Sequence, residues 1–261
     1  MSVSVSGGSG PIAGRTALVT GAGNGLGRAI AIELAARGAR VIVTGRQAVK
    51  LDAVAAVIGQ NARAETCDVS DEESVAALAR AVMGEEISIL VNNAGIAGPV
   101  APLTDVAVAD WDEVFAVNVR GVFLMCRALI PQMIGRGAGD VVNIASVSGK
   151  RPLARRTPYT ASKMAVIGLT ATLAVEVGPL GVVVNSLSPG PVAGPRMDRN
   201  FALEAERTGV SVEEAEEAFV SRSALHRMVT EREVAQAVTA MLAMPGLCGA
   251  DIDLSAGMMA R

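Results

Sequence analysis

Cysteine and histidine are scarce in this chain of 261 residues. The three cysteines, Cys67, Cys126 and Cys248, are far apart and form no C-x-x-C pair, so the sequence predicts neither a disulfide framework nor a zinc site. The only histidine, His226, has no carboxylate or second ligand near it in the sequence, and we interpret it as a structural or surface residue. We therefore expect no metal site, and three reduced thiols in a reducing compartment.

The chain also lacks an excess of positive charge and a long uncharged apolar run. Its net charge is −3, which argues against nucleic acid or an anionic membrane as the main partner. No uncharged apolar run reaches the roughly 18 residues that span a bilayer. Residues 1–10 have neither a basic region nor an apolar core, so no signal peptide is visible. The sequence predicts a soluble, cytoplasmic protein.

Aromatic residues make up only 2% of the chain, and Tyr159 is the only tyrosine. A tyrosine used for packing would be expected to have companions elsewhere. Lys163, one of three lysines, follows four positions later, on the same face if Pro158–Val177 is a helix. A nearby ammonium lowers a phenol pKa, and a change from about 10 to about 7 requires roughly 4 kcal/mol. The pair therefore predicts a proton donor or acceptor useful at neutral pH.

Short β-branched runs alternate with longer stretches rich in Ala, Leu, Arg and Glu over the whole chain. This alternation predicts a single α/β domain over residues 14–261, with a doubly wound parallel sheet and helices on both faces. The predicted strands are Ala17–Thr20, Val41–Thr44, Ala64–Cys67, Ile87–Val91, Val141–Ile144, Val182–Leu187 and Asp251–Leu254. The predicted helices are Leu26–Arg37, Ala48–Ile58, Asp71–Val82, Trp111–Ile134, Pro158–Val177 and Glu231–Ala243.

Three local features complete this organisation. Ser70 and Glu73 have the spacing of a capping box at the start of the third helix. Residues 1–13 are expected to be a flexible lead-in. Residues 191–225 are rich in Pro, Gly and charge, and we expect them to form a substrate lid with a short helix near Val212–Ser221.

A glycine-rich turn follows the first predicted strand, with glycines at positions 21, 23, 25 and 27. The spacing is G-x-x-x-G-x-G, which allows close backbone approach and places the N-terminus of a helix against a pyrophosphate. An ordinary glycine-rich turn between a strand and a helix is the alternative. The second predicted strand is followed by Gly45 and Arg46, with no acid to bind a ribose 2′-hydroxyl. Arg46 would pair with a 2′-phosphate, so the sequence favours NADP(H), with NAD(H) possible. The alternative interpretation of Arg46 is a solvated loop residue.

Taken together, the glycine turn, the segment Asn92-Asn-Ala-Gly95, Ser146 and the Tyr159-x-x-x-Lys163 pair resemble the short-chain dehydrogenase/reductase family. The resemblance extends from about Gly14 to Gly257. It implies a Rossmann-type sheet with strand order 3-2-1-4-5-6-7, hydride transfer between a nicotinamide and a carbonyl or alcohol, and often a tetramer.

The resemblance also implies residue roles. Tyr159 would be the acid/base, Lys163 would bind the nicotinamide ribose, Ser146 would hydrogen-bond the substrate oxygen, and Asn118 would hold a water that relays protons to Lys163. The expected cofactor contacts, besides Arg46, Tyr159 and Lys163, are Gly21, Asn24, Gly25, Leu26, Gly27, Asp68, Val69, Asn92, Ala94, Gly95, Pro189, Gly190 and Val192.

This sequence departs from the family pattern at two places. Gly194 stands where the family usually has a threonine that hydrogen-bonds the carboxamide. Ser255-Ala256-Gly257 stands where the family usually has Asp-Gly-Gly. Neither departure is in the catalytic group.

A ketone or secondary alcohol is the expected substrate, for example a 3-oxoacyl or other hydroxy/keto compound. Several cations flank the tyrosine and the lid, and they predict an anionic substrate unless they are solvated surface or subunit interface. They are Lys150, Arg151, Arg155, Arg156, Arg196 and Arg199. The alternatives to an NADPH-dependent reductase are an NAD-linked catabolic dehydrogenase and, from another class, a non-catalytic nucleotide-binding relative.

The stretch Met164–Val177 is apolar almost all round. A helix that is apolar on more than one face needs more than one partner. One face would cover the sheet, and we expect the other to pack against a second subunit, with Gly121–Ile134 nearby. The sequence thus predicts a homo-oligomer, a dimer or a tetramer.

Overall fold

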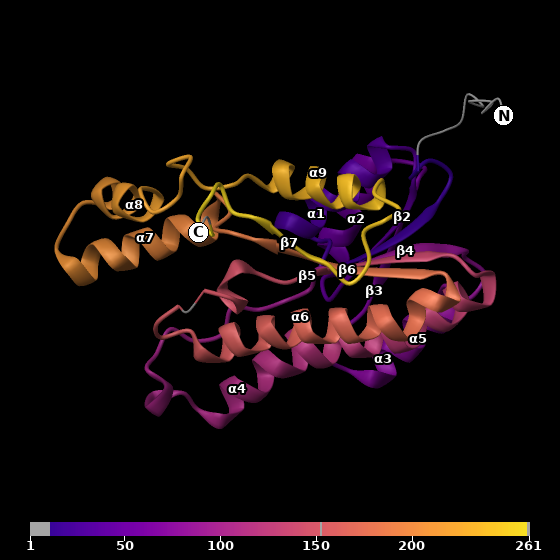
Figure 1. Ribbon diagram of the computed structural model, residues 1–261, viewed down its shortest axis with the longest axis horizontal. Coiled ribbons are helices and arrows are strands. Elements are labelled where there is room, and N and C mark those ends of the chain that lie inside the picture. Colours follow the sequence, from indigo (N-terminus) through magenta and orange to yellow (C-terminus); the bar gives the residue numbers. More distant parts are fainter. Residues whose placement is uncertain (1–10, 152, 260–261) are drawn as a thin grey trace.

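The computed structural model describes residues 11–151 and 153–259, and it contains one parallel sheet of seven strands (Figure 1). The strand order is β3-β2-β1-β4-β5-β6-β7, as predicted. Its strands are β1 (Thr16–Thr20), β2 (Arg40–Gly45), β3 (Ala62–Thr66), β4 (Ile87–Asn92), β5 (Gly139–Ile144), β6 (Val182–Pro189) and β7 (Asp251–Leu254). All seven predicted strands are confirmed, with ends that differ by a few residues.

Helices cover both faces of the sheet: α1, α2 and α9 lie on one face, and α3, α5 and α6 lie on the other (Figure 1). The helices are α1 (Gly25–Ala36), α2 (Ala48–Ile58), α3 (Glu72–Ala81), α4 (Val108–Phe115), α5 (Gly121–Arg136), α6 (Thr157–Val177), α7 (Pro195–Thr208), α8 (Val212–Val220) and α9 (Glu231–Leu242).

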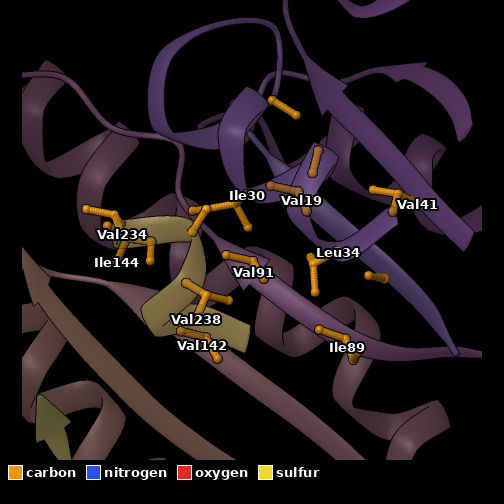
Figure 2. Close-up of a cluster of buried hydrophobic side chains, with 14 of the residues drawn as sticks. Val19, Ile30, Leu34, Val41, Ile89, Val91, Val142, Ile144, Val234 and Val238 are labelled. Atoms are coloured by element: carbon orange, nitrogen blue, oxygen red, sulfur yellow. The ribbon is translucent and has the colours of Figure 1, made fainter. Parts of the chain in front are cut away.

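Two hydrophobic cores lie on opposite faces of the sheet because successive strand residues point to opposite sides. In β1, Ala17 and Val19 join the core under α1 and α9, whereas Leu18 joins the core under α5 and α6. Figure 2 shows the first core, in which Ile30 and Leu34 of α1 meet residues of the strands and α9. Every residue of β1 is buried, as expected for a parallel sheet covered on both faces.

The capping box predicted at Ser70 and Glu73 is wrong. The cap of α3 is Asp71, whose side chain accepts a hydrogen bond of 3.0 Å from the Ser74 amide. The Ser70 hydroxyl instead donates to Asp68 Oδ1 at 2.7 Å. Because Asp68 holds the serine hydroxyl, the neighbouring aspartate is left to cap the helix.

The helix predicted over Trp111–Ile134 runs further, from Val108 to Arg136, and it changes form in the middle. Residues Ala116–Arg120 form a π turn between α4 and α5. A π turn contains one residue more than an α-helical turn, and the spacing of apolar residues in the sequence gives no sign of it. Wider turns of this kind often mark functional sites, and this one carries Asn118.

Residues 191–225 contain two helices. The short helix expected near Val212–Ser221 is confirmed as α8, but α7 was not predicted because its sequence is highly charged. The rings of Phe201 and Phe219 meet edge to face at 5.5 Å and join the two helices. Figure 1 shows α7 and α8 together at one end of the molecule. That this segment closes over a substrate stays a prediction.

Of the lead-in predicted for residues 1–13, residues 1–10 lie outside the described residues. The remainder is packed: Ile12 is buried in the core beside α1. The Gly14 amide donates to the Gly38 carbonyl at 2.9 Å, which attaches the start of the domain to the turn before β2.

Two helical stretches, Val108–Arg136 and Thr157–Leu180, are long and apolar enough to cross a membrane, judged by length and composition alone. Both cover the sheet of the α/β fold (Figure 1). Only 28% of the apolar window in the second stretch is buried, against 56% in the first. A large part of the apolar surface of α6 is therefore exposed in a single chain.

Candidate active site

Tyr159 and Lys163 lie in the first two turns of α6, one turn apart as predicted. Lys163 is 5% exposed, and its Nζ lies 5.8 Å from the centre of the Tyr159 ring. Nζ also donates a hydrogen bond of 2.8 Å to the Ile144 carbonyl, at the end of β5. Because Ser146 is two residues beyond Ile144, this bond holds the tyrosine helix against the segment that carries the serine.

Ser146 begins the 3₁₀ turn Val147–Gly149, and its Oγ accepts a bond of 3.2 Å from the Ser148 amide. The turn rests directly on α6. A Cβ atom at Gly149 would lie 3.0 Å from the Met164 amide nitrogen and 3.1 Å from the Lys163 carbonyl carbon. Only glycine allows this approach without a shift, so the turn that begins at Ser146 packs closely against the tyrosine helix.

Asn118 is buried in the π turn and bonds to the loop after β4. Its Nδ2 donates to the Ile96 carbonyl at 2.9 Å, and its Oδ1 accepts from the Ile96 amide at 2.8 Å. A Cβ atom at Gly95 would lie 3.1 Å from Asn118 Oδ1 and 3.5 Å from Lys163 Nζ. The structure thus brings Asn118, Ser146, Tyr159 and Lys163 together, although they come from three separate segments.

Ser162 was not among the predicted site residues. Its hydroxyl donates to the Tyr159 carbonyl at 2.8 Å and accepts from Asn118 Nδ2 at 3.0 Å. It therefore links the π turn to the tyrosine helix. Its position directly before Lys163 on the same helix was the available signal, but the partner is 44 positions away in the sequence.

The glycine turn between β1 and α1 is closed tightly. A Cβ atom at Gly27 would lie 2.3 Å from the Gly21 carbonyl oxygen and 2.5 Å from Asn93 Nδ2, so no side chain fits there. Asn24, which precedes α1, makes no side-chain cap to the helix. The first amides of α1 are therefore available to an anion, and this turn fits the pyrophosphate of a dinucleotide.

Thr20 and Asn93 were also not among the predicted site residues, although Asn93 lies in the segment Asn92–Gly95 that carries the family resemblance. Thr20 Oγ1 accepts from the amides of Asn93 and Ala94 at 2.9 and 3.0 Å, and Asn93 Nδ2 donates to the Thr20 carbonyl at 2.9 Å. These bonds join the ends of β1 and β4. The segment Asn92–Gly95 therefore holds the glycine turn in place, while Asn92 itself bonds to Asn143 of β5 at 2.9 Å.

Arg46 is exposed directly after β2, beside the glycine turn, and Asp68 follows β3. Burial alone would raise the pKa of Asp68, but hydrogen bonds from Ser70 and the charge of Arg46 bring the pKa below its ordinary value. Lys50, in the first turn of α2, is a further cation here: its Cβ lies 3.1 Å from the position of a Cβ at Gly23. Val69 is buried against Gly121 at the start of α5.

Pro189, Gly190 and Val192 lie at the end of β6, on the same edge as the serine and the glycine turn. The Gly190 amide donates to the Leu254 carbonyl of β7 at 2.8 Å, and Val192 forms an isolated bridge with Val229. The carboxyl ends of parallel strands are where doubly wound folds bind nucleotides.

The two departures from the family pattern have a backbone context. Gly194 has φ of +143°, a conformation that side chains disfavour, so a threonine would be strained here. Ala256 has φ of +53°, where the usual glycine would be unstrained.

Comparison with known proteins gives one family. The family model described as short chain dehydrogenase matches residues 15–208. D-threitol dehydrogenase from Mycolicibacterium smegmatis is 43% identical over 181 residues, which cover 67% of this chain and 69% of that protein.

Two solved structures have the same fold over nearly the whole chain. Actinorhodin polyketide ketoreductase with NADPH has a TM-score of 0.89 at 32% identity, covering 97% of this chain and 100% of that one. Xylitol dehydrogenase with NAD+ bound has a TM-score of 0.88 at 29% identity, covering 94% and 99%. This chain belongs to the short-chain dehydrogenase family.

Proposed function

We propose that this protein is an NADPH-preferring reductase of ketones that also oxidises the corresponding secondary alcohols. The observation that supports this most is the gathering of Ser146, Tyr159, Lys163 and Asn118 at one edge of the sheet. The glycine turn opens at the same edge, and it fits a dinucleotide. Position and electrostatics come from the protein in such an enzyme, while the redox chemistry comes from its cofactor.

In the direction of reduction, a nicotinamide bound at this edge would supply the hydride that the carbonyl carbon receives. Negative charge then develops on the carbonyl oxygen, and the hydroxyls of Ser146 and Tyr159 donate hydrogen bonds to that oxygen. Tyr159 gives up its proton to the oxygen, which completes the alcohol. Lys163 holds a positive charge near the phenol during this transfer, and Asn118 positions the loop beside it.

We infer a preference for NADP(H) from the charged residues that would surround the adenosine end of the bound cofactor. Arg46 follows β2 where an NAD site usually has an acid, and Lys50 adds a second cation next to the glycine turn. Both charges favour a 2′-phosphate. An NAD(H)-linked dehydrogenase is the alternative, and xylitol dehydrogenase with NAD+ bound has the same fold.

We propose a small carbonyl or alcohol as the substrate, with an anionic group as a candidate feature. Arg156 is half-buried one turn before Tyr159, and its Nη2 lies 3.4 Å from Asn200 Oδ1 on α7, between the catalytic helix and the proposed lid. Lys150 is not available for this purpose, because it pairs with Asp251 and Asp253. The similarity to D-threitol dehydrogenase adds polyols to the candidates.

Purified protein is expected to turn over NADPH with at least one member of a panel of ketones, keto acids and keto sugars, or NADP+ with the matching alcohols. Cofactor consumption measured in both directions checks this. Binding of cofactor without turnover across the whole panel would contradict the proposal and favour a non-catalytic nucleotide-binding protein.

We further propose that α5 and α6 form the interface of a homo-oligomer. An open groove of about 630 Å³ lies between them, lined largely by apolar side chains such as Phe123, Ile130 and Leu173. Val175 on α6 is 77% exposed. Contiguous apolar surface of this kind is typical of subunit interfaces.

Sizing at micromolar concentration is therefore expected to give a dimer or a tetramer. Leu173→Glu places a charge in the groove and is expected to shift the protein toward monomer, because an unpaired charge is costly in an apolar interface. Val57→Glu is the matched control, since Val57 is exposed on α2 on the opposite face of the sheet. A monomeric wild-type protein, or equal effects of the two variants, would contradict the assignment.

A further inference from the structure

Lys150 is the residue at which the turn that begins with Ser146 ends. The Gly149 amide donates to the Ser146 carbonyl at 3.0 Å, and the Lys150 amide donates to the Val147 carbonyl at 3.0 Å. The backbone of Lys150 is therefore connected to Ser146 through a single tight turn. A displacement of the Lys150 backbone would therefore be transmitted to Ser146, the residue proposed to contact the substrate oxygen.

The Lys150 side chain extends from the turn after β5, past β6, to β7 at the edge of the sheet. Its Nζ pairs with Asp251 Oδ2 at 2.5 Å and with Asp253, both on β7. The other oxygen of Asp251 accepts hydrogen bonds from the hydroxyls of Ser186 at 2.7 Å and Ser188 at 2.8 Å, on β6. We call these five residues the β7 clamp. Both oxygens of Asp251 are thus occupied, which fixes the carboxylate that receives the lysine.

The clamp is shielded enough to be more than a surface ion pair. The side chains of Lys150 and Asp251 are 23% and 13% exposed, and Ser186 and Ser188 are fully buried. Burial opposes the charge on Lys150, but the hydrogen bonds and charges of Asp251 and Asp253 raise its pKa above the ordinary value. The lysine is therefore charged at neutral pH, and partly buried pairs hold their geometry better than exposed ones.

The β7 clamp connects two parts of the candidate site, the loop after β6 and the turn that begins at Ser146. Ser188 directly precedes Pro189, where the loop on the proposed nicotinamide side begins. On the other side of the turn, Gly149 rests against α6 at Lys163 and Met164. Ser146 is consequently held from β5 before it, from α6 beneath the turn, and from β7 through Lys150.

We propose that Lys150 is a positioning residue for Ser146: through the β7 clamp it holds the serine hydroxyl at the distance at which it can donate to the substrate oxygen. This inference rests on the proposed function. A misplacement of about 1 Å in a reacting group costs up to about 100-fold in rate, so a residue that sets this distance influences kcat without touching the substrate.

The test is a double-mutant cycle of Lys150→Met and Ser146→Ala. Lys150→Met is expected to lower kcat by about 10-fold in the Ser146 background, with the Kd for NADPH unchanged, because the hydroxyl is displaced. In the Ser146→Ala background the same substitution is expected to change kcat by less than about twofold, because residues that act through one another are non-additive. Lys150→Arg keeps the charge and is expected to restore most of the rate.

Two further measurements separate positioning from a general loss of stability. Hydrogen exchange of the amides at 148–151 is expected to be faster in Lys150→Met than in wild type and slow again in Lys150→Arg. The control is Arg40→Met, which breaks the pair between Arg40 and Glu85. Arg40 is the first residue of β2 and lies away from the carboxyl ends of the strands, so this variant is expected to leave kcat unchanged.

Equal falls in kcat in the two backgrounds, or no fall in either, would overturn the inference while leaving the proposed function intact. Unchanged exchange at 148–151 in an active Lys150→Met protein would also overturn it. A wild-type protein that turns over no member of the carbonyl panel contradicts the proposed function, and the inference falls with it.

Discussion

Tyr159→Phe is expected to lower kcat by about 10²- to 10⁴-fold, the usual contribution of a general acid or base. The substitution removes one hydroxyl and keeps the ring that lies 5.8 Å from Lys163 Nζ. The proton donor to the carbonyl oxygen is lost, while the glycine turn is untouched. Steady-state kinetics with a substrate found in the panel, together with a Kd for NADPH, measures both parts.

The Kd for NADPH and the melting temperature are the controls for Tyr159→Phe. Both are expected to change little, since the phenylalanine fills the same half-buried space on α6. Because Tyr159 is the only tyrosine, no second phenol in the chain can take over its role. A variant that keeps most of the wild-type rate would exclude Tyr159 as the proton donor.

Arg46→Ala is expected to weaken NADPH binding by about 10- to 100-fold, which corresponds to the loss of one or two charge-assisted hydrogen bonds. The Kd for NADH is expected to change by less than about threefold, because NADH has no 2′-phosphate for the arginine to contact. The ratio of the two dissociation constants therefore moves toward NADH. Direct titration of each cofactor measures this ratio.

Arg40→Ala is the matched control, because Arg40 is an exposed arginine at the start of β2, the strand that Arg46 follows, and it pairs there with Glu85. It is expected to leave both dissociation constants unchanged. If wild type binds NADH more tightly than NADPH, or if Arg46→Ala weakens both cofactors equally, the NADP(H) preference is wrong. Lys50→Ala extends the test to the second cation beside the glycine turn.

The parts of the fold that follow from local pattern could be predicted from the sequence. Short β-branched runs and longer stretches of helix-forming residues are visible in the sequence, and all seven predicted strands and all seven predicted helices occur in the structure. The shared edge of Ser146 and the glycine turn follows from the same reasoning, since both come directly after parallel strands, whose carboxyl ends meet there.

The parts that depend on contacts between distant segments could not be predicted. Ser70 was expected to cap α3, but its hydroxyl donates to Asp68, and Asp71 caps the helix instead. Sequence spacing alone does not show which of these two neighbouring residues caps the helix. The π turn at Asn118 leaves no periodic signal. The pairing of Lys150 with Asp251 joins positions 101 residues apart, so the lysine was grouped with the cations near the substrate.

The central claim is that Tyr159 and its neighbours serve a hydride transfer to a carbonyl carbon. NADPH deuterated at the carbon that carries the transferred hydride tests it most directly, with mass spectrometry of the alcohol formed from a ketone substrate of the panel. The account predicts one deuterium on the carbinol carbon in wild type and greatly slowed formation of the same labelled product in Tyr159→Phe. An alcohol without deuterium on that carbon, or equally fast formation of the labelled product in Tyr159→Phe, would contradict it.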